Sequence, residues 1–201
     1  DLAQSRLSKV RFQKVRLAAV SLQSAELAGC SFSGCDFCAV RFDDARLDGG
    51  RFQNCTFDSC DFSRARLEKT VFISCRFKRC LFTATDMEQC AGSFTRLEAC
   101  TLAGVRLRGR QFKSCRLEGV DLTGAAVHGA QFFGLEACDV VLERAVLYEC
   151  EVLESELGEC CGRSWRVLGS VVDAPCLLAA ARRTRREVVD ALEEDSGLKV
   201  W

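Results

Sequence analysis

Nearly every fifth residue is apolar, and usually large, from Leu2 to Val172. Of the 35 positions in this register, 33 carry an apolar residue, and the exceptions are Gly92 and Gly162. Neither the 3.6-residue period of an amphipathic helix nor the two-residue period of a strand produces this spacing. Two residues before nearly every central position, as far as Cys160, stands Val, Ala, Cys, Ser, Thr or Gly. One large and one small side chain in every five are therefore expected to point inward.

A second period of twenty residues predicts the shape. Leucine recurs in one column and phenylalanine in the next, at Leu7, Leu27, Leu47 and Leu67 and at Phe12, Phe32, Phe52 and Phe72. Residues twenty apart thus share an environment, so four pentapeptides make one coil. A single coil cannot bury its inward side chains, whereas stacked coils form a continuous core. We therefore expect residues 1–172 to form an all-β solenoid of about eight coils.

Two segments carry a family resemblance. CDFSRARLEKTVF at 60–72 and CRLEGVDLTGAAV at 115–127 resemble the pentapeptide-repeat family, whose motif is approximately A(D/N)LXX. The resemblance extends over residues 1 to about 172. It implies a right-handed quadrilateral β-helix, and it is far more specific for fold than for function.

The pattern changes after Val172. Asp173 and Pro175 are residues that start helices, and Ser196–Gly197 is a stop signal, so one helix is expected over 176–195. Residues 173–201 would form a C-terminal helical segment that caps the open core of the last coil. We also expect this segment to make a homodimer. The apolar residues assigned to capping and dimerisation are Leu177, Leu178, Val188, Val189, Leu192, Leu198, Val200 and Trp201.

Charge is divided along the chain. Residues 1–120 carry a net charge of +7 and residues 121–201 a net charge of −7, although the whole chain is neutral. This division can serve a partner-binding surface, because an electric field of one sign steers the association of a partner. The alternative is that the charges only solvate the surface. The predicted partner-binding residues are the acidic side chains of the final coils, Glu136, Asp139, Glu143, Glu149, Glu151, Glu154, Glu156 and Glu159.

The register is irregular at one place. Gly92 stands where phenylalanine is expected, Phe94 is out of register, and Arg110 occupies an inward position one coil later. We expect Phe94 or the Arg110 stem to fill the space, with the guanidinium reaching solvent. A kink or a small pocket is the alternative.

Cysteine is frequent but does not indicate a redox or metal site. Eleven of the fifteen cysteines stand at the small inward position, where they interchange with alanine, valine and threonine. In the segment GCSFSGCDFCAVRF (29–42), Cys30 and Cys35 should face inward and Cys38 outward, so the C-x-x-C pair cannot share a metal or a disulfide. Reduced thiols predict a cytoplasmic protein. We expect no metal site and no cofactor.

No catalytic constellation is evident. The only histidine, His128, is expected on the surface without a partner, so we predict a protein that is not an enzyme. Acidic residues interrupt the N-terminal arginines and the aromatic residues face the core, which argues against direct nucleic-acid binding. No run approaches the ~18 apolar residues of a membrane span.

Resemblance supplies the leading function. The length and the tail GLKVW are similar to the MfpA, Qnr and AlbG groups of the family. This implies a rod-like dimer that binds DNA gyrase or topoisomerase IV, partly by DNA mimicry, and gives resistance or self-immunity to quinolones or natural topoisomerase poisons. The alternative is a structural or protein-interaction scaffold, either on its own or as part of a larger protein or an effector.

Overall fold

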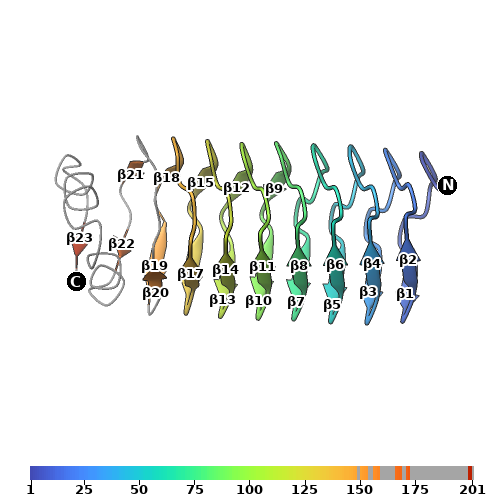
Figure 1. The fold of residues 1–201 in the computed structure, drawn as a ribbon, viewed down its shortest axis with the longest axis horizontal. Helices are drawn as coiled ribbons and strands as arrows, with labels where there is room; N and C mark the ends of the chain where they lie inside the picture. Colours follow the sequence, from blue (N-terminus) through green and yellow to red (C-terminus); the bar gives the residue numbers. More distant parts are fainter. Residues whose placement is uncertain (149, 154–155, 159–165, 169–170, 173–198, 201) are drawn as a thin grey trace.

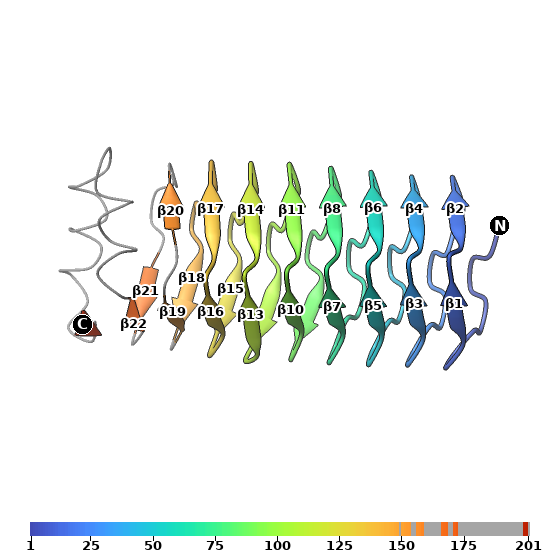
Figure 2. The ribbon, with the colours of Figure 1, turned by 90° about the horizontal axis from the view of Figure 1, so that it is seen from below.

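The chain is an elongated stack of β-coils. The computed structural model describes residues 1–148, 150–153, 156–158, 166–168, 171–172 and 199–200, with side chains for 1–148, 150 and 151. Its regular structure consists of short strands, β1 to β23, and the coils follow one another along a single axis from the N-terminus (Figures 1 and 2). The predicted helix over 176–195 lies outside the described residues.

Three parallel sheets form walls of the rod. The first contains ten strands: β1 (Arg11–Gln13), β3 (Ser31–Ser33), β5 (Arg51–Gln53), β7 (Val71–Ile73), β10 (Ala91–Ser93), β13 (Gln111–Lys113), β16 (Gln131–Phe133), β19 (Glu151–Leu153), β22 (Val171–Val172) and β23 (Lys199–Val200). The second contains eight: β2 (Arg16–Ala18), β4 (Asp36–Cys38), β6 (Thr56–Asp58), β8 (Arg76–Lys78), β11 (Arg96–Glu98), β14 (Arg116–Glu118), β17 (Glu136–Cys138) and β20 (Glu156–Gly158). The third contains five: β9 (Asp86–Glu88), β12 (Arg106–Arg108), β15 (Ala126–His128), β18 (Val146–Tyr148) and β21 (Arg166–Leu168).

Strand register confirms the twenty-residue coil. Phe12 pairs with Phe32, and Leu107 pairs with Val127. Bridges at the same spacing, such as Ser21 with Arg41, mark the fourth wall. Because each wall advances by one coil every twenty residues, the predicted all-β solenoid with four pentapeptides per coil is correct. The eight-stranded sheet has one strand from each of eight successive coils.

At the corners between walls the backbone adopts the left-handed conformation. In most pentapeptides the residue two after the central position has a positive φ, and for residues other than glycine the angle lies between 48° and 60°. This conformation is costly for a residue with a Cβ. Backbone hydrogen bonds to the adjacent coil hold it in place, as when Lys14 N donates to Ser33 O at 2.9 Å. The corners therefore repeat without needing glycine at each one.

Stacked aromatic rings fill the N-terminal half of the core. Within three ladders, consecutive rings lie 4.5–5.2 Å apart and nearly parallel. Rings of neighbouring walls meet edge to face, as Phe52 does with Phe57. Both geometries are favourable for aromatic pairs. The ladders are Phe12–Phe32–Phe52–Phe72, Phe37–Phe57–Phe77 and Phe42–Phe62–Phe82.

The small inward residues add hydrogen bonds between coils. Cys55 Sγ donates to the carbonyl oxygen of Phe32 at 3.5 Å, and Thr70 Oγ1 donates to that of Leu47 at 2.9 Å. In both cases the acceptor lies 23 residues earlier, at the central position of the preceding coil. Cysteine and threonine thus make the same contact, which explains why they interchange at this position.

Candidate functional site

The predicted acidic residues that the structure describes are spread over three walls instead of forming a patch on one side. Glu136 lies in β17, Asp139 at the corner that follows, and Glu143 on the fourth wall, while Glu151 lies in β19 of the first sheet. Glu136, Asp139 and Glu151 are exposed, and Glu143 is half-buried. These four side chains therefore form an acidic band spread over several walls. Glu156 is placed in β20, next to Glu136 in the ladder, whereas Glu149, Glu154 and Glu159 lie outside the described residues.

Three of the four acidic side chains already have partners. Arg116 Nη1 lies 3.2 Å from Glu136 Oε2, and Gln131 Nε2 donates to Glu151 Oε2 at 2.9 Å. Arg144 Nε lies 3.8 Å from Glu143 Oε1. All three contacts are exposed to solvent, where ion pairs are worth little and are exchanged readily. The acidic band can thus take up new cationic partners at small cost.

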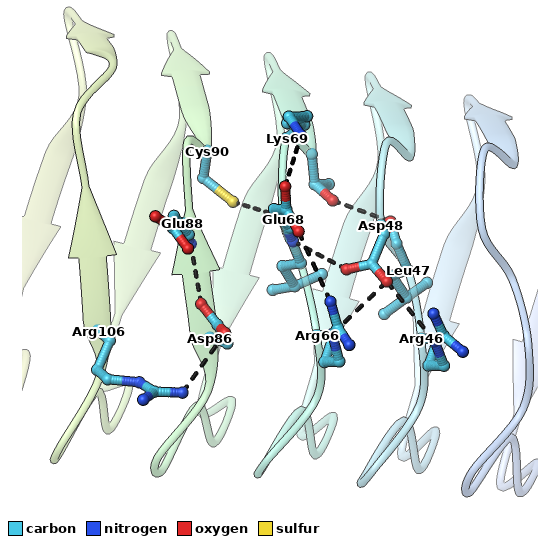
Figure 3. A network of polar contacts seen from close by, with 12 residues as sticks. Arg46, Leu47, Asp48, Arg66, Glu68, Lys69, Asp86, Glu88, Cys90 and Arg106 are labelled. Carbon is cyan, nitrogen blue, oxygen red and sulfur yellow. Dashed lines mark hydrogen bonds and ion pairs between the residues drawn. The ribbon is translucent and has the colours of Figure 1, made fainter.

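The arginines of the N-terminal half are largely neutralised, which charge counting along the sequence does not reveal. Figure 3 shows one such network, in which Asp48 lies between Arg46 and Arg66, at 3.7 Å from each. The same ladder continues to Asp86, whose carboxylate lies 3.4 Å from Arg106. The ion pairs could have been predicted from the sequence, because residues of opposite charge recur twenty positions apart and so lie one coil apart.

Local electrostatics follow from these pairs. A two-point contact from the Arg64 guanidinium, at 2.8 and 2.9 Å, lowers the pKa of Asp44 below its ordinary value. The Lys69 ammonium, 2.6 Å from Glu68, lowers the pKa of that carboxyl in the same way. These carboxylates remain ionised at neutral pH, so the net positive charge of this half is carried by a few cations outside such pairs.

The inward cysteines that the structure describes are core residues, as predicted. Cys30 and Cys35 are buried and Cys38 is exposed, and all three are free thiols. Burial raises the pKa of the Cys115 thiol, and it raises that of Cys90 to about 12. Nucleophilic and metal-binding cysteines act as thiolates, so burial disfavours both chemistries at Cys90 and Cys115. Among the residues described, no three His, Cys, Asp or Glu side chains gather in a way that would hold a metal ion.

His128 differs from its prediction. Its side chain is half-buried, and its ring stacks on that of Tyr148 with the centroids 4.9 Å apart. The two residues are neighbours in the ladder between β15 and β18. An outward residue can thus be partly covered by the next coil, which explains why the expectation of a surface histidine without a partner was wrong.

The irregular place near Gly92 also differs from its prediction. Phe94 is 67% exposed and fills no space in the core. Instead, a Cβ built at residue 92 would lie 2.9 Å from Cδ1 of Phe112, so the ring of the following coil covers the glycine. Arg110 is exposed and lies in an open pocket of about 490 Å³. The alternative of a small pocket at this place is therefore the one that the structure supports.

Of the residues assigned to dimerisation, the structure places one. Val200 lies in β23, which pairs in parallel with β22 and so continues the first sheet. Leu177, Leu178, Val188, Val189, Leu192, Leu198 and Trp201 lie outside the described residues. In the part of the chain that is described, no helix has the length and apolarity that a membrane span requires.

Sequence comparison decides the family. The model of the pentapeptide repeat region matches residues 5–76 and 50–160, which together span most of the chain. This chain belongs to the pentapeptide repeat family. No curated protein matches the sequence of this pentapeptide repeat protein significantly.

Solved structures agree on the fold. A trypsin-treated variant of QnrB1, described as a plasmid-mediated fluoroquinolone resistance protein, superposes with a TM-score of 0.64 and 15% identity over 93% of this chain and 91% of that chain. Full-length QnrB1 gives a TM-score of 0.56 and 18% identity over 78% of this chain and 93% of that chain. At such identities the likeness establishes the shared solenoid fold.

Proposed function

We propose that this pentapeptide repeat protein binds DNA gyrase or topoisomerase IV, partly by mimicking DNA, and protects the enzyme from quinolones or natural topoisomerase poisons. It does so without catalysis of its own. The acidic coils, Glu136, Asp139, Glu143, Glu149, Glu151, Glu154, Glu156 and Glu159, contact the basic DNA-binding surface of the topoisomerase.

One observation carries this proposal. On a rod with the fold of QnrB1, the C-terminal coils carry exposed carboxylates at Glu136, Asp139 and Glu151. Ion pairs such as Asp48 with Arg46 and Arg66 meanwhile neutralise much of the N-terminal half. Charge of one sign steers association with a surface of the opposite sign. The mimicry is partial, because the acidic band occupies one end of the rod.

A protection assay tests the proposal. Gyrase supercoiling is measured with a fluoroquinolone and increasing amounts of the protein, using wild type and the double variant Glu136→Gln with Asp139→Asn. Loss of two steering charges should raise the concentration for half-maximal protection about threefold to tenfold. The control, Glu26→Gln with Asp36→Asn, removes two half-buried acids from the other end of the rod and should leave protection unchanged. Absence of protection by wild type at stoichiometric amounts contradicts the proposal.

The proposal includes a homodimer formed through residues 173–201 and a cytoplasmic location. Dimerisation would place two sets of acidic coils beside the two-fold axis, as a long duplex-like ligand requires. The buried free thiols, including Cys55 and Cys75, suit a reducing compartment. Light scattering at micromolar concentration tests the dimer, and a monomeric mass argues against it.

A protein-interaction scaffold is the second candidate function. The stacked phenylalanine ladders and the coil-to-coil ion pairs, such as Arg64 with Asp44, give a rod whose coils are held in fixed register. Such a rod can hold partners at a set spacing. Capture of a stable partner other than a topoisomerase, together with no protection in the supercoiling assay, would favour this function.

A further inference from the structure

One wall of the rod carries no acidic residue over seven coils. We call it the acid-free wall, and it consists of strands β1, β3, β5, β7, β10, β13 and β16 with the residues that flank them, 10–14, 30–34, 50–54, 70–74, 90–94, 110–114 and 130–134. All 28 Asp and Glu residues of the chain lie elsewhere. The other three walls mix both signs, as Asp48, Asp58 and Asp61 illustrate.

The cations of the acid-free wall have no ion-pair partners among the described residues. They are Arg11, Lys14, Arg51, Arg110 and Lys113, and all five are exposed. On the neighbouring walls, by contrast, arginines such as Arg46, Arg66 and Arg116 meet carboxylates. Unpaired positive charge is therefore concentrated on one side of the rod.

The pairing between two strands of this wall is incomplete next to Arg110. The ladder between β10 and β13 pairs Gly92 with Phe112 and Ser93 with Lys113 but omits Ala91 and Gln111. The flanking ladders include both residues, because Ala91 pairs with Val71 and Gln111 with Gln131. The open pocket of about 490 Å³ lies at this gap and is lined by Ala91, Gly109, Arg110, Gln111, Gly129 and Gln131.

Two exposed phenylalanines lie next to Lys113 on the same wall. Phe94 is 67% exposed, and its backbone N–H donates to the carbonyl oxygen of Lys113 at 2.9 Å. Phe133 is 44% exposed and pairs with Lys113 in the ladder between β13 and β16. These strands are neighbours in the stack (Figure 2). Exposed aromatic side chains next to cations mark surfaces that contact partners.

We propose that this region, the Arg110 patch (Phe94, Arg110, Gln111, Lys113, Gln131 and Phe133), docks an acidic segment of a partner protein. A carboxylate of the segment enters the pocket and accepts hydrogen bonds from the Arg110 guanidinium. A second carboxylate pairs with Lys113, and apolar side chains of the segment pack on Phe94 and Phe133. Charge complementarity identifies the occupant, because Arg110 and Lys113 have no ion-pair partner among the described residues, and the nearby Glu151 of the next coil contacts Gln131.

A polypeptide fits this patch better than a nucleic acid does. Single-stranded nucleic acid is held by a continuous basic groove that follows its phosphates. Here the three coils of the patch contain only two cations, Arg110 and Lys113. The side-chain amide of Gln131 is already hydrogen-bonded to Glu151. One guanidinium in a pocket matches one carboxylate. The patch touches the acidic coils through the contact of Gln131 with Glu151. Arg110 and Lys113 are not among the acidic residues proposed to meet a topoisomerase, so separate variants test the two surfaces.

Fluorescence anisotropy with the full chain tests the docking. The probe is a labelled twelve-residue peptide that alternates Glu and Leu, compared with a peptide that has Gln at every Glu and with a twenty-nucleotide poly-dT strand. We expect the Glu peptide to bind and the Gln peptide to bind at least about tenfold more weakly. Arg110→Ala should weaken binding of the Glu peptide about tenfold. Alanine stands at the equivalent position of the next coil, Ala130, so this variant keeps the fold.

Matched variants separate the patch from general charge. Lys78→Ala removes an exposed cation of the second sheet that has no ion-pair partner in the described part of the chain, and it should leave the affinity unchanged within about twofold. Phe94→Ser, which places the residue found at Ser74 and Ser114 of the same corner, should weaken binding severalfold. Equal losses in Arg110→Ala and Lys78→Ala, no binding of the Glu peptide, or tighter binding of poly-dT that depends on Arg110 would each overturn the proposal.

Discussion

The ring of Phe112 occupies the space that a side chain at Gly92 would need. A Cβ at residue 92 would lie 2.9 Å from Cδ1 and 3.3 Å from Cε1 of this ring, and 3.5 Å from Cys115 Sγ. Phenylalanine at position 92, as the register predicts, is thus incompatible with the present position of Phe112. The ring of Phe112 thus fills the place of the phenylalanine that is missing at position 92 of the ladder.

Gly92→Ala should therefore destabilise the protein, although alanine normally favours strands over glycine. Overpacking of this kind costs about 1–3 kcal/mol in the free energy of unfolding, measured by urea denaturation. Phe112→Leu shortens the obstructing side chain, so the double variant should recover part of that cost. Additive losses in the double-mutant cycle would show that the two residues do not compete for space.

Phe57 tests the aromatic ladders. Its ring is stacked between those of Phe37 at 4.7 Å and Phe77 at 4.5 Å, and it is 1% exposed. Phe57→Ala should cost about 3–5 kcal/mol by urea unfolding, because a cavity remains in a wall that cannot collapse. Phe57→Leu should cost only about 1–2 kcal/mol, since leucine occupies the same column at Leu97 and Leu117. Equal costs would mean that stacking, and not volume, determines the stability of this column.

The corner backbone makes a prediction with opposite signs at two alanines. Ala99 is exposed at a corner with φ of 49°, where Ala99→Gly removes the strain of a Cβ and should raise the free energy of unfolding by about 0.5–1 kcal/mol. The control is Ala18→Gly at an exposed position of strand β2. Glycine in a strand loses more conformational freedom on folding, so this variant should lower the free energy of unfolding by about 0.5–1 kcal/mol. Thermal unfolding of both variants measures these changes. A lower stability of Ala99→Gly than of the wild type would contradict the corner geometry.

Repetition explains what could be predicted from sequence and what could not. The walls, the coil length and the inward thiols followed from the period, because every pentapeptide meets the same neighbours. At Gly92 the repeat breaks, and only packing decides that Phe112 and not Phe94 covers the glycine. Partners of the surface arginines depend on rotamers as well: Arg41 pairs with Asp43 of its own wall, whereas Arg64 reaches Asp44 of the preceding coil. The Arg110 patch depends on which wall each charge occupies, and a sum of charges along the sequence does not contain that information.

Stability should fall in alkaline solution because of the buried thiols, and Cys90 isolates the effect. Burial raises the pKa of Cys90 from 9.0 to about 12, so the folded protein keeps a proton that the unfolded chain loses above pH 9. The unfolded state then binds fewer protons, and the free energy of unfolding decreases by up to about 1.4 kcal/mol per pH unit between pH 9 and 12. Below pH 9 the contribution is constant.

Cys90→Thr removes this titration and keeps the contact. Cys90 Sγ donates to the carbonyl oxygen of Leu67 at 2.8 Å, and Thr70 makes the same contact one coil earlier at 2.9 Å. Urea unfolding of wild type and variant at pH 8, 9, 10 and 11 should give a difference that is constant up to pH 9 and then shifts in favour of the variant by about 1 kcal/mol per unit. The remaining buried thiols cancel in the comparison. Parallel curves across this range would show that Cys90 reaches solvent and titrates normally in the folded protein.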